Sequence, residues 1–197
     1  MKLLALTQRG VAVPPHGEKR DSLARDWYPF LKALDCQWLV LPNEPEAALG
    51  LARRFDLGGL ILTGGEDLGQ YPERDETEAL LLAWCRQNSR PVLGVCRGFQ
   101  FMHLWLGGAL EPVDPARHRA RRHVVEFQNG ERREVNSYHN FAPAGQAGPL
   151  GPLARCLEDG VLEAAAAPGL LGLSWHPERE VRPMAADVDL IKKFMES

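Results

Sequence analysis

The fold follows from Pro91-Val-Leu-Gly-Val-Cys-Arg-Gly-Phe-Gln100, an apolar run that ends at a cysteine between two glycines. Residues 92–95 are typical of a fully buried strand, whereas the apolar residues of 99–105 recur at helical spacing. Cys96 should therefore lie on a strand-to-helix turn at the carboxyl edge of a sheet. The two glycines allow the backbone to turn sharply at this point.

Cys96 has two competing interpretations. As a nucleophile on such an elbow, it would gain thiolate character from the N–H groups and the dipole at the start of the next helix. As a buried structural residue it would only fill space, which is the commoner role of a single cysteine. The motif alone leaves both open, because a nucleophilic thiol also needs a base and a group that orients the base.

A candidate base and its orienting group occur together in Gly172-Leu-Ser-Trp-His-Pro-Glu178. The apolar residues predict a last core strand, beyond which His176 and Glu178 can lie on one side of the chain. An imidazole can take the proton of a thiol and return it to a leaving group, and a carboxylate holds the imidazole in the required tautomer. Either residue alone is more often a solvated surface residue. Their combination with Cys96 favours a catalytic role.

A family resemblance rests on residues 94–100 and 174–178, with support from 58–67 and 135–139. Across nearly the whole chain these segments resemble the class I glutamine amidotransferase-like superfamily, and within it the γ-glutamyl hydrolases related to γ-glutamyl-γ-aminobutyrate hydrolase. Arg97, directly after the cysteine, favours the hydrolase branch over ammonia-delivering glutaminase subunits. The resemblance implies an open, mostly parallel flavodoxin-like sheet with helices on both faces and a small antiparallel hairpin.

The resemblance also implies roles for individual residues. By it, Cys96, His176 and Glu178 form a triad that cleaves a γ-glutamyl carbon–nitrogen bond through a thioester, without a cofactor. The groups implied to hold the glutamyl moiety are those at Gln100, Asn136, Ser137, Tyr138 and His139.

The chain departs from the family pattern at Asn140-Phe141, where many relatives carry a second histidine and then a glutamine. This difference affects what leaving group the site should accept, and it leaves the expected binding of the glutamyl group unchanged. Segments similar to 137–141 and 7–9 occur in hydrolases that act on γ-glutamylated nucleotide phosphoramidates such as γ-glutamyl-CDP-amidate, in capsule sugar modification. This weaker resemblance implies a nucleotide amidate as the leaving group, and a simple amine is the alternative.

The loop Thr63-Gly-Gly-Glu-Asp67 should face the same sheet edge as Cys96, because it follows a buried strand at 60–62. Paired glycines let backbone N–H groups approach a developing oxyanion. We expect the N–H groups of Gly65 and Arg97 to form the oxyanion hole, with Gly64 supporting the loop and lining the substrate site. Without the elbow, an ordinary turn would be the better interpretation.

The remaining sequence alternates strand and helix patterns, which predicts a parallel sheet covered on both faces. Expected strands are 2–7, 38–41, 60–62 and 92–95, and expected helices are one capped by Asp21 or Ser22 and reaching Leu34, 45–55, 76–87 and one after Cys96. Antiparallel strands are expected at 123–127 and 132–135 around the turn Asn129-Gly130. Residues 8–21, 142–152 and 164–169 are expected to be loops.

Arg9 is a candidate substrate contact because loops at the carboxyl ends of strands usually build the pocket, although a solvated loop is the commoner outcome.

A basic run, Arg117-His-Arg-Ala-Arg-Arg-His123, follows the elbow helix. Charged runs are usually solvated faces. The alternative is a landing site for a phosphate or carboxylate, because guanidinium groups match these anions bidentately. The candidate leaving-group contacts are Arg117, Arg119, Arg121 and Arg122.

Composition limits the remaining possibilities. The chain has 197 residues, one domain's length, and a formal net charge of −3, which implies no general affinity for nucleic acid or membranes. Its four cysteines are scattered, without close pairs for a zinc site, so we expect reduced thiols and no metal. The amino-terminal apolar stretch is too short for a signal sequence. We therefore expect one domain, 1–197, in the cytoplasm, with a small-molecule substrate.

Three functional hypotheses remain from the sequence. The first is a stand-alone γ-glutamyl hydrolase that needs no synthase partner. The second is a glutaminase subunit that feeds ammonia to a synthase and turns over slowly without it. The third is a noncatalytic binding module, which ranks last because all three triad residues are present. The leaving group, the oligomeric state and the pathway stay open.

Overall fold

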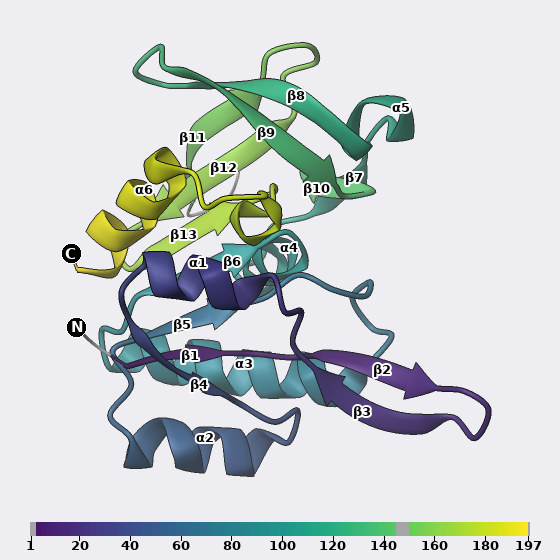
Figure 1. The fold of residues 1–197 in the computed structure, drawn as a ribbon, viewed down its shortest axis with the longest axis vertical. Coiled ribbons are helices and arrows are strands. Elements are labelled where there is room, and N and C mark those ends of the chain that lie inside the picture. Colours follow the sequence, from purple (N-terminus) through teal and green to yellow (C-terminus); the bar gives the residue numbers. More distant parts are fainter. Residues whose placement is uncertain (1–2, 145–149, 197) are drawn as a thin grey trace.

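A nine-stranded sheet forms the centre of the fold, with the strand order β4-β1-β5-β6-β13-β12-β11-β8-β9 (Figure 1). The computed structural model describes residues 3–144 and 150–196. Five neighbouring strands pair in parallel: β4 (Gln37–Val40), β1 (Leu3–Leu6), β5 (Gly59–Leu62), β6 (Val92–Val95) and β13 (Leu170–Leu173). The others extend the sheet in antiparallel pairing: β12 (Leu162–Ala167), β11 (Gly151–Cys156), β8 (Arg119–Phe127) and β9 (Arg132–Tyr138).

Helices cover both faces of the parallel part. The helices α1 (Trp27–Ala33) and α6 (Ala185–Met195) pack in one apolar cluster with Ile61 and Leu93. On the other face, Leu60 and Val92 share a cluster with α2 (Pro45–Arg54), α3 (Pro72–Gln87) and α4 (Arg97–Trp105). Strands buried on both faces explain the continuous apolar runs in the sequence. This confirms the expected α/β class. None of the described helices is both long and apolar enough to span a membrane.

Residues 8–21 are not the loop that the sequence predicted. They form an antiparallel hairpin of β2 (Arg9–Val13) and β3 (Glu18–Ser22) that projects away from the sheet in Figure 1. The prediction failed because β3 is charged and exposed, so no apolar alternation marks it. The first helix consequently begins at Trp27, beyond the proposed caps Asp21 and Ser22.

The antiparallel part of the sheet is larger than the single hairpin expected. Residues 164–167, read as loop, belong to β12, whose Ala164 and Ala165 are fully buried. Alanine has a low strand propensity, but here its small side chain suits a strand enclosed between two others. Residues 151–152, also read as loop, begin β11. Residues 145–149 of that predicted loop lie outside the described part of the chain, as does residue 2 of the first strand.

Four short elements complete the region beyond α4. β7 (Leu110–Pro112) pairs with β10 (Phe141–Pro143), which brings the end of β9 back towards the elbow helix. The short helix α5 (Pro115–His118) leads into β8, and a 3-10 turn, η1 (Pro177–Arg179), follows β13. The sequence patterns predicted none of them.

Candidate active site

Cys96 occupies the expected strand-to-helix turn, between β6 and α4. Its backbone angles are φ 50° and ψ −106°, an uncommon conformation for a residue with a side chain. Such strain is typical of a nucleophile elbow. The neighbouring glycines are required, because a Cβ on Gly98 would lie 2.0 Å from the Leu62 carbonyl oxygen and one on Gly94 would lie 2.7 Å from the Gly98 carbonyl oxygen.

The end of β13 brings the candidate base to this elbow. β13 pairs in parallel with β6, Leu173 opposite Val95, so the chain after each strand emerges at the same edge. On one side, the His176 side chain lies close enough to Cys96 for the two groups to interact electrostatically. On the other side, its Nδ1 lies 2.7 Å from Glu178 Oε1. The three predicted triad residues are thus joined in one buried chain of contacts.

The charges in this chain of contacts favour a protonated imidazole. Burial opposes protonation of His176, but the neighbouring Cys96 and Glu178 outweigh it and raise its pKa to about 9. Burial acts in the opposite sense on two other thiols, raising the pKa of Cys85 to about 12 and that of Cys156 to about 11. These two cysteines should therefore be poor nucleophiles near neutral pH.

The glycine loop after β5 lies against the imidazole. A Cβ on Gly64 would lie 2.6 Å from His176 Cε1, and a Cβ on Gly65 would lie 2.5 Å from Arg74 Nη1. The loop can approach this closely only because both side chains are absent. On the facing side, the N–H of Arg97 is in the first turn of α4, where no intrahelical partner exists for it. That the N–H groups of Gly65 and Arg97 form the oxyanion hole remains a prediction.

A buried arginine holds this loop in place, and the sequence analysis missed it. Arg74 is fully buried and donates hydrogen bonds to the Thr63 carbonyl oxygen at 2.7 Å and the Gly64 carbonyl oxygen at 3.4 Å. It also pairs with Glu78 at 2.9 Å and with Glu66 at 3.0 Å. In the sequence, Arg74 and Glu78 are only an i,i+4 pair of opposite charge, which is typical of a solvated helix face.

Glu78 connects the same network to the elbow helix. Its carboxylate accepts a hydrogen bond from Thr7 Oγ1 at 2.7 Å and pairs with the side chain of Arg97, which also contacts Asp75. Burial would raise the pKa of Glu78, but Arg74 and Arg97 lower it below its usual value. The Arg97 side chain is therefore used to join α4 to α3 rather than being free to contact a substrate.

In the predicted glutamyl-binding segment, some side chains are used in hydrogen bonds within the protein and others are free to contact a substrate. Asn136 Nδ2 donates to the His176 carbonyl oxygen at 2.8 Å, while its Oδ1 accepts from the His176 N–H at 2.9 Å. Ser137 Oγ donates to the His118 carbonyl oxygen at 2.7 Å. These two side chains hold the backbone, the first directly behind the base. His139 is buried away from solvent, close to Glu163.

Three of the predicted substrate-contact residues have an exposed surface or a polar atom with which a substrate can interact. Tyr138 is 42% exposed, and its ring centroid lies 5.7 Å from that of His176. Gln100 Nε2 donates to the Phe141 carbonyl oxygen at 2.7 Å, which leaves its side-chain oxygen without a described partner. Arg9 is exposed and lines a small pocket with Gly64 and His176.

The four arginines of the basic run differ in position. Arg122 pairs with Glu134 at 3.0 Å and Glu180 at 2.9 Å, and Arg117 lies 3.6 Å from Asp114. For Arg119 and Arg121, the described residues offer no charged partner. Arg119 lies directly opposite Tyr138 in the β8–β9 pair, and opposite residues share a face of the sheet.

A bulge separates the two unpaired arginines. The register shifts between Arg119 and Arg121, so that Arg121 lies opposite Ser137 instead. Because successive residues of β9 face opposite sides, Arg119 shares the Tyr138 face and Arg121 the other. Of the four arginines in the basic run, Arg119 alone combines the Tyr138 face with a charge that no described residue pairs.

We predict that Gly64→Ala slows hydrolysis without unfolding the protein. The new methyl group would displace His176 from its contacts, and a displacement of about 1 Å can cost about 100-fold in rate. The matched control is Gly50→Ala in α2, where a Cβ meets nothing within 4 Å. Kinetics and thermal melting of both variants check the prediction. Unchanged kcat/KM for Gly64→Ala would show that the loop does not hold the imidazole.

Comparison with known proteins identifies the family. The sequence profile of the Peptidase C26 family matches residues 6–178. The chain is 31% identical, over 187 residues and 90% of each chain, to gamma-glutamyl-CDP-amidate hydrolase of Campylobacter jejuni. It is 29% identical over 177 residues to the carbamoyl phosphate synthase small chain of Ruegeria pomeroyi, covering 85% of this chain and 42% of that protein.

A solved structure shows the same fold. The crystal structure of a glutamine amidotransferase from Thermotoga maritima matches with a TM-score of 0.67 and 15% identity, covering 98% of this chain and 83% of that chain. At this identity the match concerns the arrangement of the sheet and helices alone. The profile match and the 31% identity to the Campylobacter jejuni protein together mean that the chain belongs to the peptidase C26 family of class I glutamine amidotransferase-like hydrolases.

Proposed function

We propose that the chain is a single-domain, stand-alone γ-glutamyl hydrolase in which Cys96, His176 and Glu178 form the catalytic triad. The observation that carries the proposal is the buried chain of contacts from Cys96 through His176 to Glu178, placed at a strained elbow. A structural cysteine needs neither the strained backbone nor a charged imidazole beside it. The combination is that of a nucleophile with its base.

The proposed reaction has two stages. The Cys96 thiolate attacks the γ-carbonyl carbon, and the N–H groups of Gly65 and Arg97 stabilise the negative charge on the carbonyl oxygen. The carbon–nitrogen bond then breaks as the His176 imidazolium gives its proton to the departing nitrogen, leaving a γ-glutamyl thioester. In the second stage His176 takes a proton from water, which attacks the thioester, and glutamate departs as the thiolate is restored.

We further propose a γ-glutamyl nucleotide phosphoramidate as the substrate. The 31% identity to gamma-glutamyl-CDP-amidate hydrolase supports this choice. Arg119 supports it independently, since an unpaired guanidinium on the Tyr138 face could pair with a phosphate next to the reacting bond. Tyr138 is partly exposed, and its ring, with the Arg179 guanidinium 4.7 Å from the ring centroid, lies beside His176 where the leaving group would lie.

Arg119→Gln should weaken binding of a nucleotide substrate selectively. A charge-assisted hydrogen bond contributes about 1.5–3 kcal/mol, partly screened by salt, so KM for a γ-glutamyl nucleotide should rise about tenfold. Cleavage of a small γ-glutamyl amine should barely change. Arg121→Gln, on the other face of β8, is the matched control. The readout is the ratio of kcat/KM for the nucleotide substrate to kcat/KM for the amine. If Arg119→Gln and Arg121→Gln change this ratio equally, the basic run is a solvated surface that does not contact the substrate.

A second candidate function follows from the similarity to a carbamoyl phosphate synthase small chain. In this alternative the same triad hydrolyses glutamine and delivers ammonia to a separate synthase. It predicts that free glutamine is the preferred substrate and that turnover is slow until the synthase is present.

A panel of substrates separates the two candidates. Purified protein alone is incubated with a γ-glutamyl nucleotide phosphoramidate, several γ-glutamyl amines and glutamine, and the products are followed by mass spectrometry. The proposal predicts that glutamate and the free nucleotide amidate form fastest, with no added protein. Release from glutamine alone, or no turnover of any member, would contradict it.

A further inference from the structure

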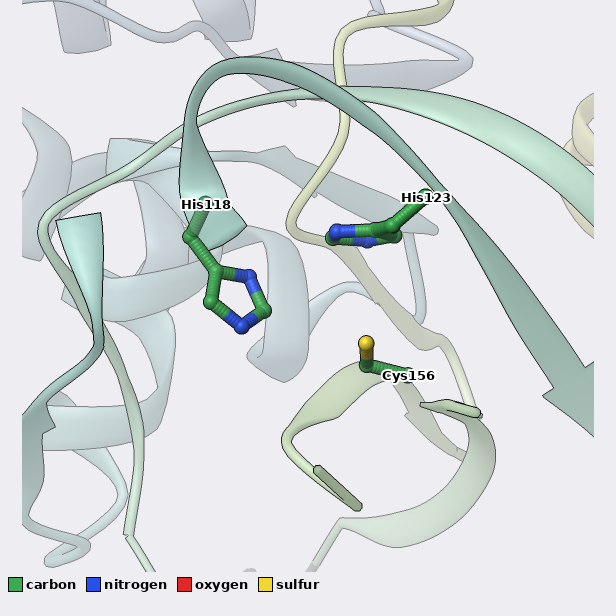
Figure 2. Close-up of side chains that lie close together, drawn as sticks. All are labelled: His118, His123 and Cys156. Carbon is green, nitrogen blue, oxygen red and sulfur yellow. The ribbon is translucent and has the colours of Figure 1, made fainter. Parts of the chain in front are cut away.

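Three histidines and a glutamate form a buried cluster beside the substrate segment. His118 Nδ1 lies 3.2 Å from Glu163 Oε1, and His123 Nε2 and His139 Nε2 each lie 3.3 Å from the same oxygen. All four side chains are at least 96% buried. Figure 2 shows His118 and His123 with the sulfur of Cys156 beside them.

The inner atoms of this cluster lie close to one another, but none makes a well-aligned hydrogen bond to a described residue. This holds for Nδ1 of His118, Nε2 of His123 and His139, and both carboxylate oxygens of Glu163. Buried polar atoms in native proteins are nearly always paired. Unpaired atoms gathered around one buried carboxylate therefore indicate a partner among them.

The outer ring nitrogens, by contrast, all face acceptors. His118 Nε2 lies 2.9 Å from Asp159 Oδ2, His139 Nδ1 lies 3.1 Å from the Phe141 carbonyl oxygen, and His123 Nδ1 lies 3.5 Å from the Arg117 carbonyl oxygen. A neutral imidazole has one donor and one acceptor nitrogen. If each donor serves its outer acceptor, the inner nitrogens direct lone pairs at a carboxylate. This arrangement is repulsive unless a ring takes a second proton or a metal cation lies between them.

We propose that the cluster binds one divalent transition-metal ion of the zinc type. His118, His139 and Glu163 supply three ligand atoms, which all lie within 4.8 Å of one another, and water would take the fourth position, as in zinc sites with three protein ligands. Zinc ligands at about 2.0–2.1 Å in tetrahedral geometry are separated by about 3.3 Å. The nitrogens of His118 and His139 lie at this spacing from Glu163 Oε1, at 3.2 Å and 3.3 Å.

The type and charge of the ligands agree with this ion. Imidazole suits zinc, copper, nickel and iron, whereas calcium and magnesium prefer sites made of oxygen. A divalent ion would be balanced by Glu163 and, through His118, by Asp159. A carboxylate behind a coordinating histidine is a regular feature of zinc sites, because it fixes the tautomer of the ring.

The ion would fasten the substrate segment from behind. His118 ends α5 directly before β8, His139 follows the end of β9, and Glu163 belongs to β12. His139 shares the Phe141 carbonyl oxygen with Gln100, one of the predicted glutamyl contacts. The proposed role is therefore structural, holding segment 136–141 against the sheet, and metal binding itself does not depend on the proposed function.

Metal content and melting temperature test the site directly. Untagged protein from zinc-supplemented cells should contain about one zinc per chain by elemental mass spectrometry. Removal by a chelator should lower the melting temperature, and added zinc should restore it. His118→Gln and Glu163→Gln should each weaken zinc binding by more than about 100-fold. The matched control is His103→Gln, a buried histidine of α4 outside the cluster, which should bind zinc as the wild type does.

The inference fails if stripped wild-type protein binds zinc no more tightly than His118→Gln, or if zinc leaves the melting temperature unchanged. A second measurement uses only the wild-type protein, so it tests the site even if the substituted proteins do not fold. Cobalt added to stripped wild-type protein should give the visible absorption of a tetrahedral nitrogen-and-oxygen site. A spectrum identical to that of cobalt in buffer would overturn the proposal.

Discussion

Cys96→Ala is expected to lower kcat/KM by about 10⁴-fold or more while leaving the fold intact. The thiolate forms and breaks the covalent bond in the proposed reaction, and no other described group could replace it. Alanine keeps the backbone geometry of the elbow and removes only the sulfur, which is buried among apolar residues. Thermal melting and circular dichroism should therefore change little.

Cys85→Ala is the matched control for this loss. Cys85 is also buried, but burial raises the pKa of its thiol to about 12, so it should have no chemical role. Activity should survive this substitution even if some stability is lost. Comparable turnover by Cys96→Ala and Cys85→Ala would exclude covalent catalysis by Cys96.

His176→Ala should lower kcat/KM by about 10²–10⁴-fold, the usual contribution of general acid–base catalysis. Glu178→Gln should cost less, because Glu178 positions and stabilises the imidazole but does not carry the proton. Steady-state kinetics of the two variants check the order. A Glu178→Gln enzyme slower than His176→Ala would contradict the assigned roles.

The pH profile distinguishes these roles further. His176 must be protonated to act as the acid, and its pKa is raised to about 9. In the wild type, kcat/KM should therefore fall as the pH rises through about 9. Glu178 contributes to this raised pKa, so Glu178→Gln should move the alkaline limb to lower pH. A limb that stays in place in the variant would show that Glu178 does not act on the imidazole.

The elbow and its partners could be predicted because their signals are local in the sequence. Gly94 and Gly98 are required by close backbone approach, and such requirements appear directly as residue types at fixed spacing. His176 and Glu178 are two residues apart beyond one apolar strand. The α/β class, likewise, is visible as alternating apolar runs and helical patterns.

The features of the structure that the sequence did not predict are formed by segments that lie far apart in the chain. Arg74 and Glu78 read as a surface pair, and only the packing of α3 beneath the glycine loop makes them a buried support. The histidines at 118 and 139 and Glu163 are separated by more than twenty residues in each step, and antiparallel pairing brings them together. β12 was missed because its alanines carry no strand signal.

The most direct test of the proposed chemistry is to trap the intermediate. Protein mixed with a γ-glutamyl nucleotide phosphoramidate is quenched in acid within one turnover, digested and examined by mass spectrometry. The account predicts one γ-glutamyl group, held as a thioester, on the peptide that contains Cys96. Products that form in the same time course with no adduct, or with the adduct on another residue, would contradict a mechanism centred on Cys96.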